Sequence, residues 1–260
     1  MSTATTQDLW VEGHAGRLFV RSWSPAPQHS DIPLVIFHDS LGCVELWRGF
    51  PAALSIATGR RVIAYDRLGF GRSDPYPGKL PPDFIAREAT TGFATMRQQL
   101  GIDAFVVFGH SVGGGMAINC AARFGSACVA VVTESAQAFI EDRTIQGIEA
   151  ARRTFMEAGQ TKRLEKYHGD KAEWVLDAWI GTWLDPAFAT WSLQPVLPEV
   201  RCPILAIHGV DDEFGSLRHP ELIRQFAAGT TRVHAMADTG HVPHREREQI
   251  VLTTVAGFLK

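Results

Sequence analysis

The sequence predicts an α/β protein whose parallel sheet is covered by helices on both faces. Short apolar runs of strand length recur along the chain, and they are continuous rather than alternating, which is typical of strands buried on both faces. Segments of helical character separate them, and strands that alternate with helices indicate βαβ units. The apolar runs are Leu34–Phe37, Val62–Tyr65, Ala104–Phe108, Val129–Val132 and Ile204–Ile207.

The helical segments between these runs complete the alternation. They are expected at Glu45–Thr58, Pro82–Leu100, Val112–Phe124, Leu217–Ala228 and Glu246–Phe258. Near the N-terminus, Leu9–Glu12 and Arg17–Trp23 flank the turn sequence Gly13–Gly16. Two such segments around a short glycine-containing turn predict an antiparallel hairpin at the sheet edge.

The alternation is interrupted once, over residues 138–199. This stretch has helical character, no run of strand type and many aromatic side chains, among them Phe139, Trp179 and Trp183. Because open α/β sheets bind ligands beyond the carboxyl ends of their strands, we interpret 138–199 as a helical lid inserted into a core of 1–137 and 200–260. An ordinary helical layer with aromatic core residues is the alternative. On the lid interpretation, the three aromatic residues are candidates for substrate contact.

Composition excludes several classes of function. The 260 residues carry 25 Lys and Arg against 28 Asp and Glu, a net charge of −3 with no basic block, which disfavours binding to nucleic acid. No apolar run approaches the length of a membrane span, and the first residues lack the features of a secretory signal. The four cysteines form no CxxC pair and are expected to be reduced. We therefore expect a cytoplasmic protein.

The most informative motif is Gly109-His110-Ser111-Val112-Gly113, of the form G-x-S-x-G. It directly follows a predicted strand and opens a predicted helix, which is the arrangement of a nucleophile elbow. Such a turn exposes the serine hydroxyl and points the free N–H groups of the helix towards developing negative charge. A glycine-rich turn that only permits close packing is the alternative.

A nucleophilic serine needs a base and an acid that orients this base. His241 is the candidate base because it lies in a loop after an apolar stretch, between Gly240 and Pro243, while His244 is expected to have a supporting role. For the acid, Asp212 is favoured over the adjacent Asp211 in a loop that follows another predicted strand. Adjacent carboxylates cannot all be buried cheaply, so one is expected to turn towards the histidine.

The oxyanion hole is expected at the loop that follows Leu34–Phe37. The backbone N–H groups of Val112 and Ser40 are the candidate donors, with Asp39 the less favoured alternative to Ser40. A carboxylate pointing into the hole would repel the oxyanion, so the Asp39 side chain is expected to point away from it.

Five motifs together resemble the α/β-hydrolase superfamily. They are Phe37–Gly42, Ala64–Ser73, Gly109–Gly114, Gly209–Asp212 and Gly240-His241, in that order along the chain. The resemblance implies a mostly parallel eight-stranded sheet, a lid inserted after the sixth strand, and the roles of nucleophile for Ser111, acid for Asp212 and base for His241. The family usually has His-Gly at the oxyanion loop, whereas Asp39 follows His38 here.

A serine at the elbow favours acyl transfer to water. We expect a serine hydrolase that cleaves a small, fairly apolar carboxylic ester or lactone. A C–C bond hydrolase of the meta-cleavage type, with an arginine such as Arg143, Arg152 or Arg153 in its pocket, and a ligand receptor on a retained hydrolase scaffold are the alternatives. The motifs imply no cofactor and no metal. The expected partner is a small acyl compound, and a homo-oligomer is compatible with the sequence.

Overall fold

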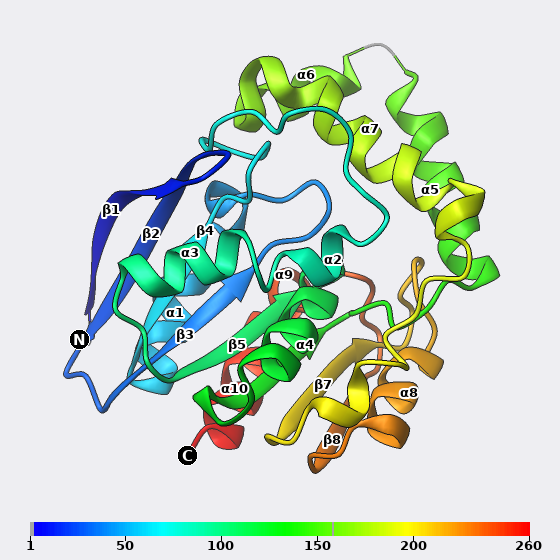
Figure 1. Cartoon of the computed structure of the whole chain (residues 1–260). Coiled ribbons are helices and arrows are strands. Elements are labelled where there is room, and N and C mark those ends of the chain that lie inside the picture. Colours follow the sequence, from blue (N-terminus) through cyan, green and yellow to red (C-terminus); the bar gives the residue numbers. More distant parts are fainter. Residues whose placement is uncertain (1–2, 158) are drawn as a thin grey trace.

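The predicted strands lie in one eight-stranded sheet of order β1-β2-β4-β3-β5-β6-β7-β8 (Figure 1). The architecture is that of a computed structural model, which describes residues 3–157 and 159–260. β1 pairs with β2 and β2 with β4 in antiparallel fashion, and all other neighbours are parallel. The strands are β1 (Thr3–Gly13), β2 (Gly16–Ala26), β3 (Ser30–Phe37), β4 (Arg60–Tyr65), β5 (Phe105–His110), β6 (Cys128–Glu134), β7 (Ile204–Gly209) and β8 (Thr231–Met236). The predicted fold class, a mostly parallel eight-stranded sheet, is confirmed.

Helices cover both faces of this sheet (Figure 1). The α-helices are α1 (Phe50–Thr58), α2 (Phe84–Arg87), α3 (Gly92–Gln99), α4 (Val112–Phe124), α5 (Asp142–Phe155), α6 (Gln160–His168), α7 (Ala172–Trp183), α8 (Arg218–Phe226), α9 (Pro243–Glu246) and α10 (Glu248–Phe258). Short 3₁₀ helices are η1 (Val44–Trp47), η2 (Gly125–Ala127), η3 (Gly169–Lys171), η4 (Pro186–Phe188) and η5 (Leu197–Glu199).

The central strand β5 shows why its sequence is continuously apolar. Phe105 and Val107 belong to one buried cluster, together with residues of α2, α3 and α4. Val106 and Phe108 belong to a second cluster, together with residues of α1 and α10. Since successive side chains of a strand point to opposite faces, a strand between two helical layers needs apolar residues at every position.

Two predicted helices are interrupted in the structure. The segment predicted as Glu45–Thr58 is divided into η1 and α1 at Arg48, whose φ of 54° is incompatible with a right-handed helix. The segment predicted as Pro82–Leu100 is divided into α2 and α3, and the amide of Phe93 donates to the carbonyl oxygen of Glu88 across the break. The spacing of apolar residues in the two predicted helices is the same on both sides of these breaks. The sequence pattern therefore did not predict the breaks.

The helices α5, α6 and α7 follow β6 and precede β7, within the stretch 138–199. Figure 1 shows them together beyond the end of the sheet towards which the parallel strand β7 points.

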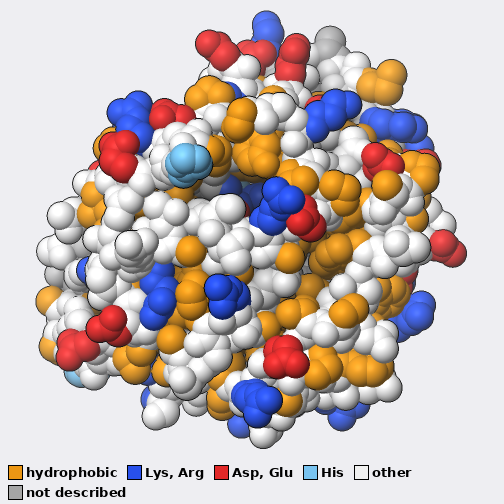
Figure 2. Space-filling model, in the orientation of Figure 1, with side chains coloured by type: hydrophobic (Ala, Val, Ile, Leu, Met, Phe, Trp, Pro, Cys, Tyr) orange, Lys and Arg blue, Asp and Glu red, His pale blue; other side chains and the backbone are white. Residues whose placement is uncertain are grey.

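The face of the molecule seen in this orientation carries a mixed surface. Figure 2 shows acidic and basic side chains scattered on it around apolar ones, without a continuous basic surface. In the parts of the chain that the structure describes, no helix has both the length and the apolar character needed to cross a bilayer.

Candidate active site

Ser111 lies at the sharp turn between β5 and α4. Its φ is +55°, a conformation that a non-glycine residue adopts only where the surroundings enforce it. A Cβ atom at Gly109 would overlap the carbonyl group of Gly113, and one at Gly113 would overlap that of Phe37. The Ser111 N–H donates to the carbonyl oxygen of Glu134 at 2.8 Å. Both glycines are therefore required by close approach of the backbone, and the elbow is tied to β6.

The structure brings Ser111, His241 and Asp212 together from three loops. Nε2 of His241 lies 3.0 Å from Oγ of Ser111, and Nδ1 of His241 lies 2.9 Å from each carboxylate oxygen of Asp212. The Asp212 side chain is fully buried, whereas that of His241 is 11% exposed. This chain of contacts allows the hydroxyl proton to pass to the imidazole while the carboxylate stabilises the resulting charge.

The choice between the two adjacent aspartates depends on burial and contacts. Asp211 is exposed, whereas Asp212 is buried against His241 and also accepts a hydrogen bond of 2.8 Å from the N–H of Phe214. Burial by itself would raise the pKa of Asp212, but the imidazole of His241 and the Phe214 amide outweigh it and hold this pKa below its usual value. His208 adds a contact of 3.4 Å to the same carboxylate. Asp212 is therefore ionised at neutral pH.

Asp39 turns its carboxylate to its neighbours in the protein. Its Oδ1 accepts from the N–H of Leu41 at 2.8 Å, and its Oδ2 lies 3.4 Å from Nδ1 of His110. The backbone N–H groups of Ser40 and Val112, which we expected in the oxyanion hole, have no acceptor among the described residues. Two N–H groups without an acceptor beside Ser111 are suited to stabilise developing negative charge.

A cavity of about 210 Å³ opens at Ser111 and His241. Trp179 and Trp183 of α7 line it. Phe139 does not line it, since its ring packs 4.6 Å from that of His219. The complete lining is Asp39, Ser40, Leu41, His110, Ser111, Gln137, Thr144, Ile148, Trp179, Trp183, Phe214, His241 and Val242.

Several lining residues were missed by sequence reasoning. Thr144 and Ile148 lie one helical turn apart on α5, and Phe214 packs 4.8 Å from the ring of His241. Gln137 is buried, and its Oε1 lies 3.2 Å from Oγ of Ser111. The one available signal for Gln137 was that it follows the predicted strand Val129–Val132. The carboxyl end of that strand lies at the edge of the sheet where Ser111 was also expected.

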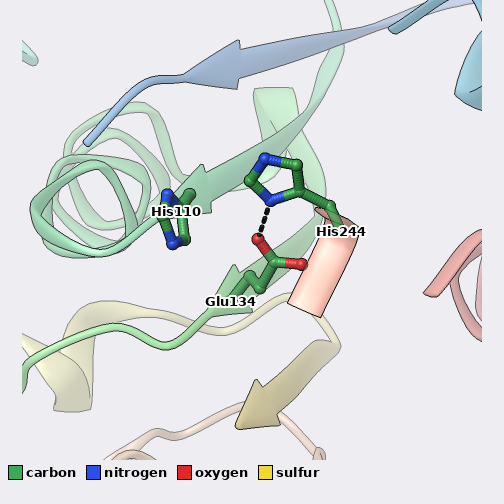
Figure 3. A group of neighbouring side chains, drawn as sticks. All are labelled: His110, Glu134 and His244. Atoms are coloured by element: carbon green, nitrogen blue, oxygen red, sulfur yellow. Dashed lines mark hydrogen bonds and ion pairs between the residues drawn. The ribbon is translucent and has the colours of Figure 1, made fainter. Parts of the chain in front are cut away.

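One group of side chains in the described ranges has donor atoms close enough to hold a metal ion: His110, Glu134 and His244 (Figure 3). Most of these atoms have partners within the protein, whereas Oε1 of Glu134 is buried without a hydrogen-bond partner among the described residues. Nδ1 of His244 lies 2.6 Å from Oε2 of Glu134, and Nε2 of His110 donates to the carbonyl oxygen of His241 at 2.8 Å. The rings of Trp47 and Phe50 pack against His244. The contacts of these three side chains fit a hydrogen-bonded network better than a metal centre.

Comparison with known proteins identifies the fold and the family. A family model described as the alpha/beta hydrolase fold matches residues 32–179. The human protein named serine hydrolase BPHL is 28% identical over 187 residues, which cover 70% of this chain and 64% of that protein. The chain thus spans somewhat less than two thirds of this relative's length.

Solved structures show the same fold. An alpha/beta hydrolase fold protein from Chitinophaga pinensis superposes with a TM-score of 0.78 at 18% identity, over 98% of both chains. The enol-lactonase from Burkholderia xenovorans LB400 superposes with a TM-score of 0.73 at 22% identity, over 96% of this chain and 99% of the other. With an elbow serine, an eight-stranded sheet and a family model that covers more than half of its residues, this chain belongs to the α/β-hydrolase family.

Proposed function

We propose that the protein is a serine hydrolase that cleaves a small, largely apolar carboxylic ester or lactone through an acyl-enzyme. The observation that carries this proposal is the contact chain from Ser111 through His241 to Asp212 at the wall of a cavity whose surface is mainly apolar. Names of related proteins, a serine hydrolase and an enol-lactonase among them, are consistent with it.

The reaction proceeds in two halves. Oγ of Ser111 attacks the carbonyl carbon of the substrate while its proton passes to Nε2 of His241, and Asp212 stabilises the imidazolium. The N–H groups of Ser40 and Val112 hold the oxyanion. Collapse of the tetrahedral intermediate breaks the bond to the alkoxy group, which takes the proton from His241. Water then attacks the acyl-enzyme with His241 as base, releasing the acid and restoring Ser111.

Cleavage of a C–C bond in a carboxylate-bearing dienoate is the second candidate, and the cavity disfavours it. Such a substrate calls for a cation, yet no Lys or Arg is found among the described residues that line the cavity. Arg143 donates instead to the carbonyl oxygen of Asp212 at 3.2 Å, and Arg152 and Arg153 are exposed. We therefore expect higher kcat/KM for neutral esters and lactones than for a dienoate.

The experiment compares three substrate classes on the purified protein: p-nitrophenyl esters, γ- and δ-lactones, and a meta-cleavage dienoate. A fluorophosphonate probe should label Ser111 covalently and abolish turnover. Faster cleavage of the dienoate than of every ester and lactone would favour the C–C hydrolase. Absence of both labelling and turnover would favour a receptor.

We further propose that 138–199 acts as a lid that selects substrates. Burying apolar substrate surface contributes about 25 cal/mol per Å², so two CH₂ groups account for about tenfold in kcat/KM. Trp179→Ala and Trp183→Ala should therefore lower kcat/KM for long-chain esters much more than for acetate. The measurement is kcat/KM for p-nitrophenyl esters from C2 to C10.

Trp174→Ala is the matched control for this prediction. Trp174 lies on the same helix, α7, but its ring stacks on Tyr76 outside the cavity. It should leave the chain-length preference unchanged. If the cavity variants instead lose activity equally at every chain length, in proportion to a lower Tm, these tryptophans are simple core residues.

A further inference from the structure

His110 occupies an unusual position between the three loops of the proposed active site. It is buried, it immediately precedes Ser111, and it lies beside Glu134 and His244 (Figure 3). Its Nε2 donates to the carbonyl oxygen of His241 at 2.8 Å, and its Nδ1 lies 3.4 Å from Oδ2 of Asp39. The ring of His110 therefore contacts the loop that carries Asp39 and Ser40, and also the loop that carries the proposed base His241. His110 is next to the proposed nucleophile in the sequence.

The partners of the ring define its protonation state. A carbonyl oxygen only accepts hydrogen bonds, so Nε2 carries a proton. A neutral Nδ1 would direct its lone pair at the Asp39 carboxylate, whereas a protonated Nδ1 forms an ion pair with it. Both ring nitrogens of His110 thus face oxygen acceptors, which is the environment of an imidazolium.

The surrounding charges agree with this assignment. Burial lowers the pKa of His110, but the carboxylates of Asp39 and Glu134 outweigh burial and raise it above the usual value. Burial correspondingly raises the pKa of Asp39, yet contact with His110 brings it far below the ordinary range. Two other titratable rings face His110, those of His241 and His244, at centroid distances of 5.1 and 5.0 Å.

The ring of His244 supplies no competing fixed charge. Burial lowers the pKa of His244, despite its contact with Glu134, so it is mainly neutral at pH 7. On the far side of Asp39, Nη2 of Arg67 donates to the Asp39 carbonyl oxygen at 2.9 Å, and Nδ1 of His38 lies 2.8 Å from the same atom. The side-chain carboxylate of Asp39 therefore has His110 as its nearest counter-ion in the described chain.

Asp39 makes this charge important for the reaction. It adjoins Ser40, whose N–H we assign to the oxyanion hole, and an uncompensated carboxylate there would oppose the oxyanion. We propose that His110 is a positioning residue held as an imidazolium, which neutralises Asp39 beside the oxyanion hole and fixes the backbone of His241. The kinetic consequence of this inference rests on the proposed function. The charge state of His110 does not.

A double-mutant cycle with His110→Gln and Asp39→Asn tests the kinetic part. Glutamine keeps an N–H donor for the His241 carbonyl and removes the charge together with the Nδ1 contact to Asp39. We expect H110Q to lower kcat for an acetate ester about a hundredfold, with KM changed less than threefold, because Asp39 is left uncompensated. Adding D39N should restore kcat at least tenfold, since the opposing carboxylate is removed. A purely structural role for His110 predicts no such rescue.

The pH dependence supplies a second readout. The folded-state pKa of His110 is raised, so its charge is complete below about 6.5 and is lost as the pH rises through the folded value. Wild-type kcat should fall on this alkaline side, whereas D39N should lack the fall because no carboxylate needs compensation. An identical alkaline fall in D39N, or a double variant no faster than H110Q, would overturn the proposal.

Nuclear magnetic resonance of ¹⁵N-histidine-labelled wild-type protein separates this inference from the proposed function. Protons on both ring nitrogens of His110 at pH 7, assigned by their loss in H110Q, are the expected result even if no ester is cleaved. A neutral His110 ring at pH 7 refutes the charge assignment. A lower pKa of this ring in D39N than in the wild type identifies Asp39 as a cause of the raised value.

Discussion

Replacing Ser111 with alanine is expected to lower kcat for ester hydrolysis by several orders of magnitude. The variant loses the proposed nucleophile, while the N–H groups of the proposed oxyanion hole and the cavity remain. Residual catalysis of about 10³–10⁴-fold over water is therefore expected. The measurement is kcat for a p-nitrophenyl ester at saturating substrate, together with fluorophosphonate labelling, which should disappear.

Stability provides the control for this variant. Ser111 adopts a positive φ that alanine can adopt at similar cost, so Tm should change little. Ser126→Ala, at an exposed serine of η2, should leave kcat within about twofold, as is usual for surface substitutions. Retention of more than a tenth of the wild-type kcat in S111A would show that another group is the nucleophile.

Asp212→Asn is expected to cost nearly as much as removal of the nucleophile, whereas Asp211→Asn should be close to neutral. The carboxylate of Asp212 contacts Nδ1 of His241 through both oxygens, and an amide neither stabilises the imidazolium nor fixes its tautomer. The corresponding change in a serine protease triad lowers kcat about 10⁴-fold. Asp211 is exposed, so its variant is the matched control.

The pH dependence of the Asp212 variant follows from the lowered pKa of this carboxyl group. Because the folded-state pKa lies below the unfolded one, Asp212 stabilises the protein above about pH 3.9. That contribution is lost as the pH falls through the folded value, and it should be missing from urea unfolding curves of D212N. Equal losses of kcat in D211N and D212N, or a greater loss in D211N, would reject the assignment.

The architecture was accessible from the sequence because its signals are local. A strand between two helical layers needs an apolar residue at every position, as β5 has, and such runs can be read without tertiary information. The elbow is likewise local, since Gly109 and Gly113 are required by backbone approach within one turn. The breaks at Arg48 and after Arg87 went unpredicted, because they leave the apolar pattern of the flanking segments intact.

By itself, the sequence determined the fold class, the elbow serine and the loops expected to carry its base and acid. Each of these depends on the order of strands and turns along the chain. The tertiary structure decided which of two adjacent carboxylates is buried, that Gln137 lies beside Ser111, and that Phe139 packs away from the cavity. It also decided that Asp39 pairs with His110. These outcomes depend on contacts between segments tens of residues apart, which no local pattern encodes.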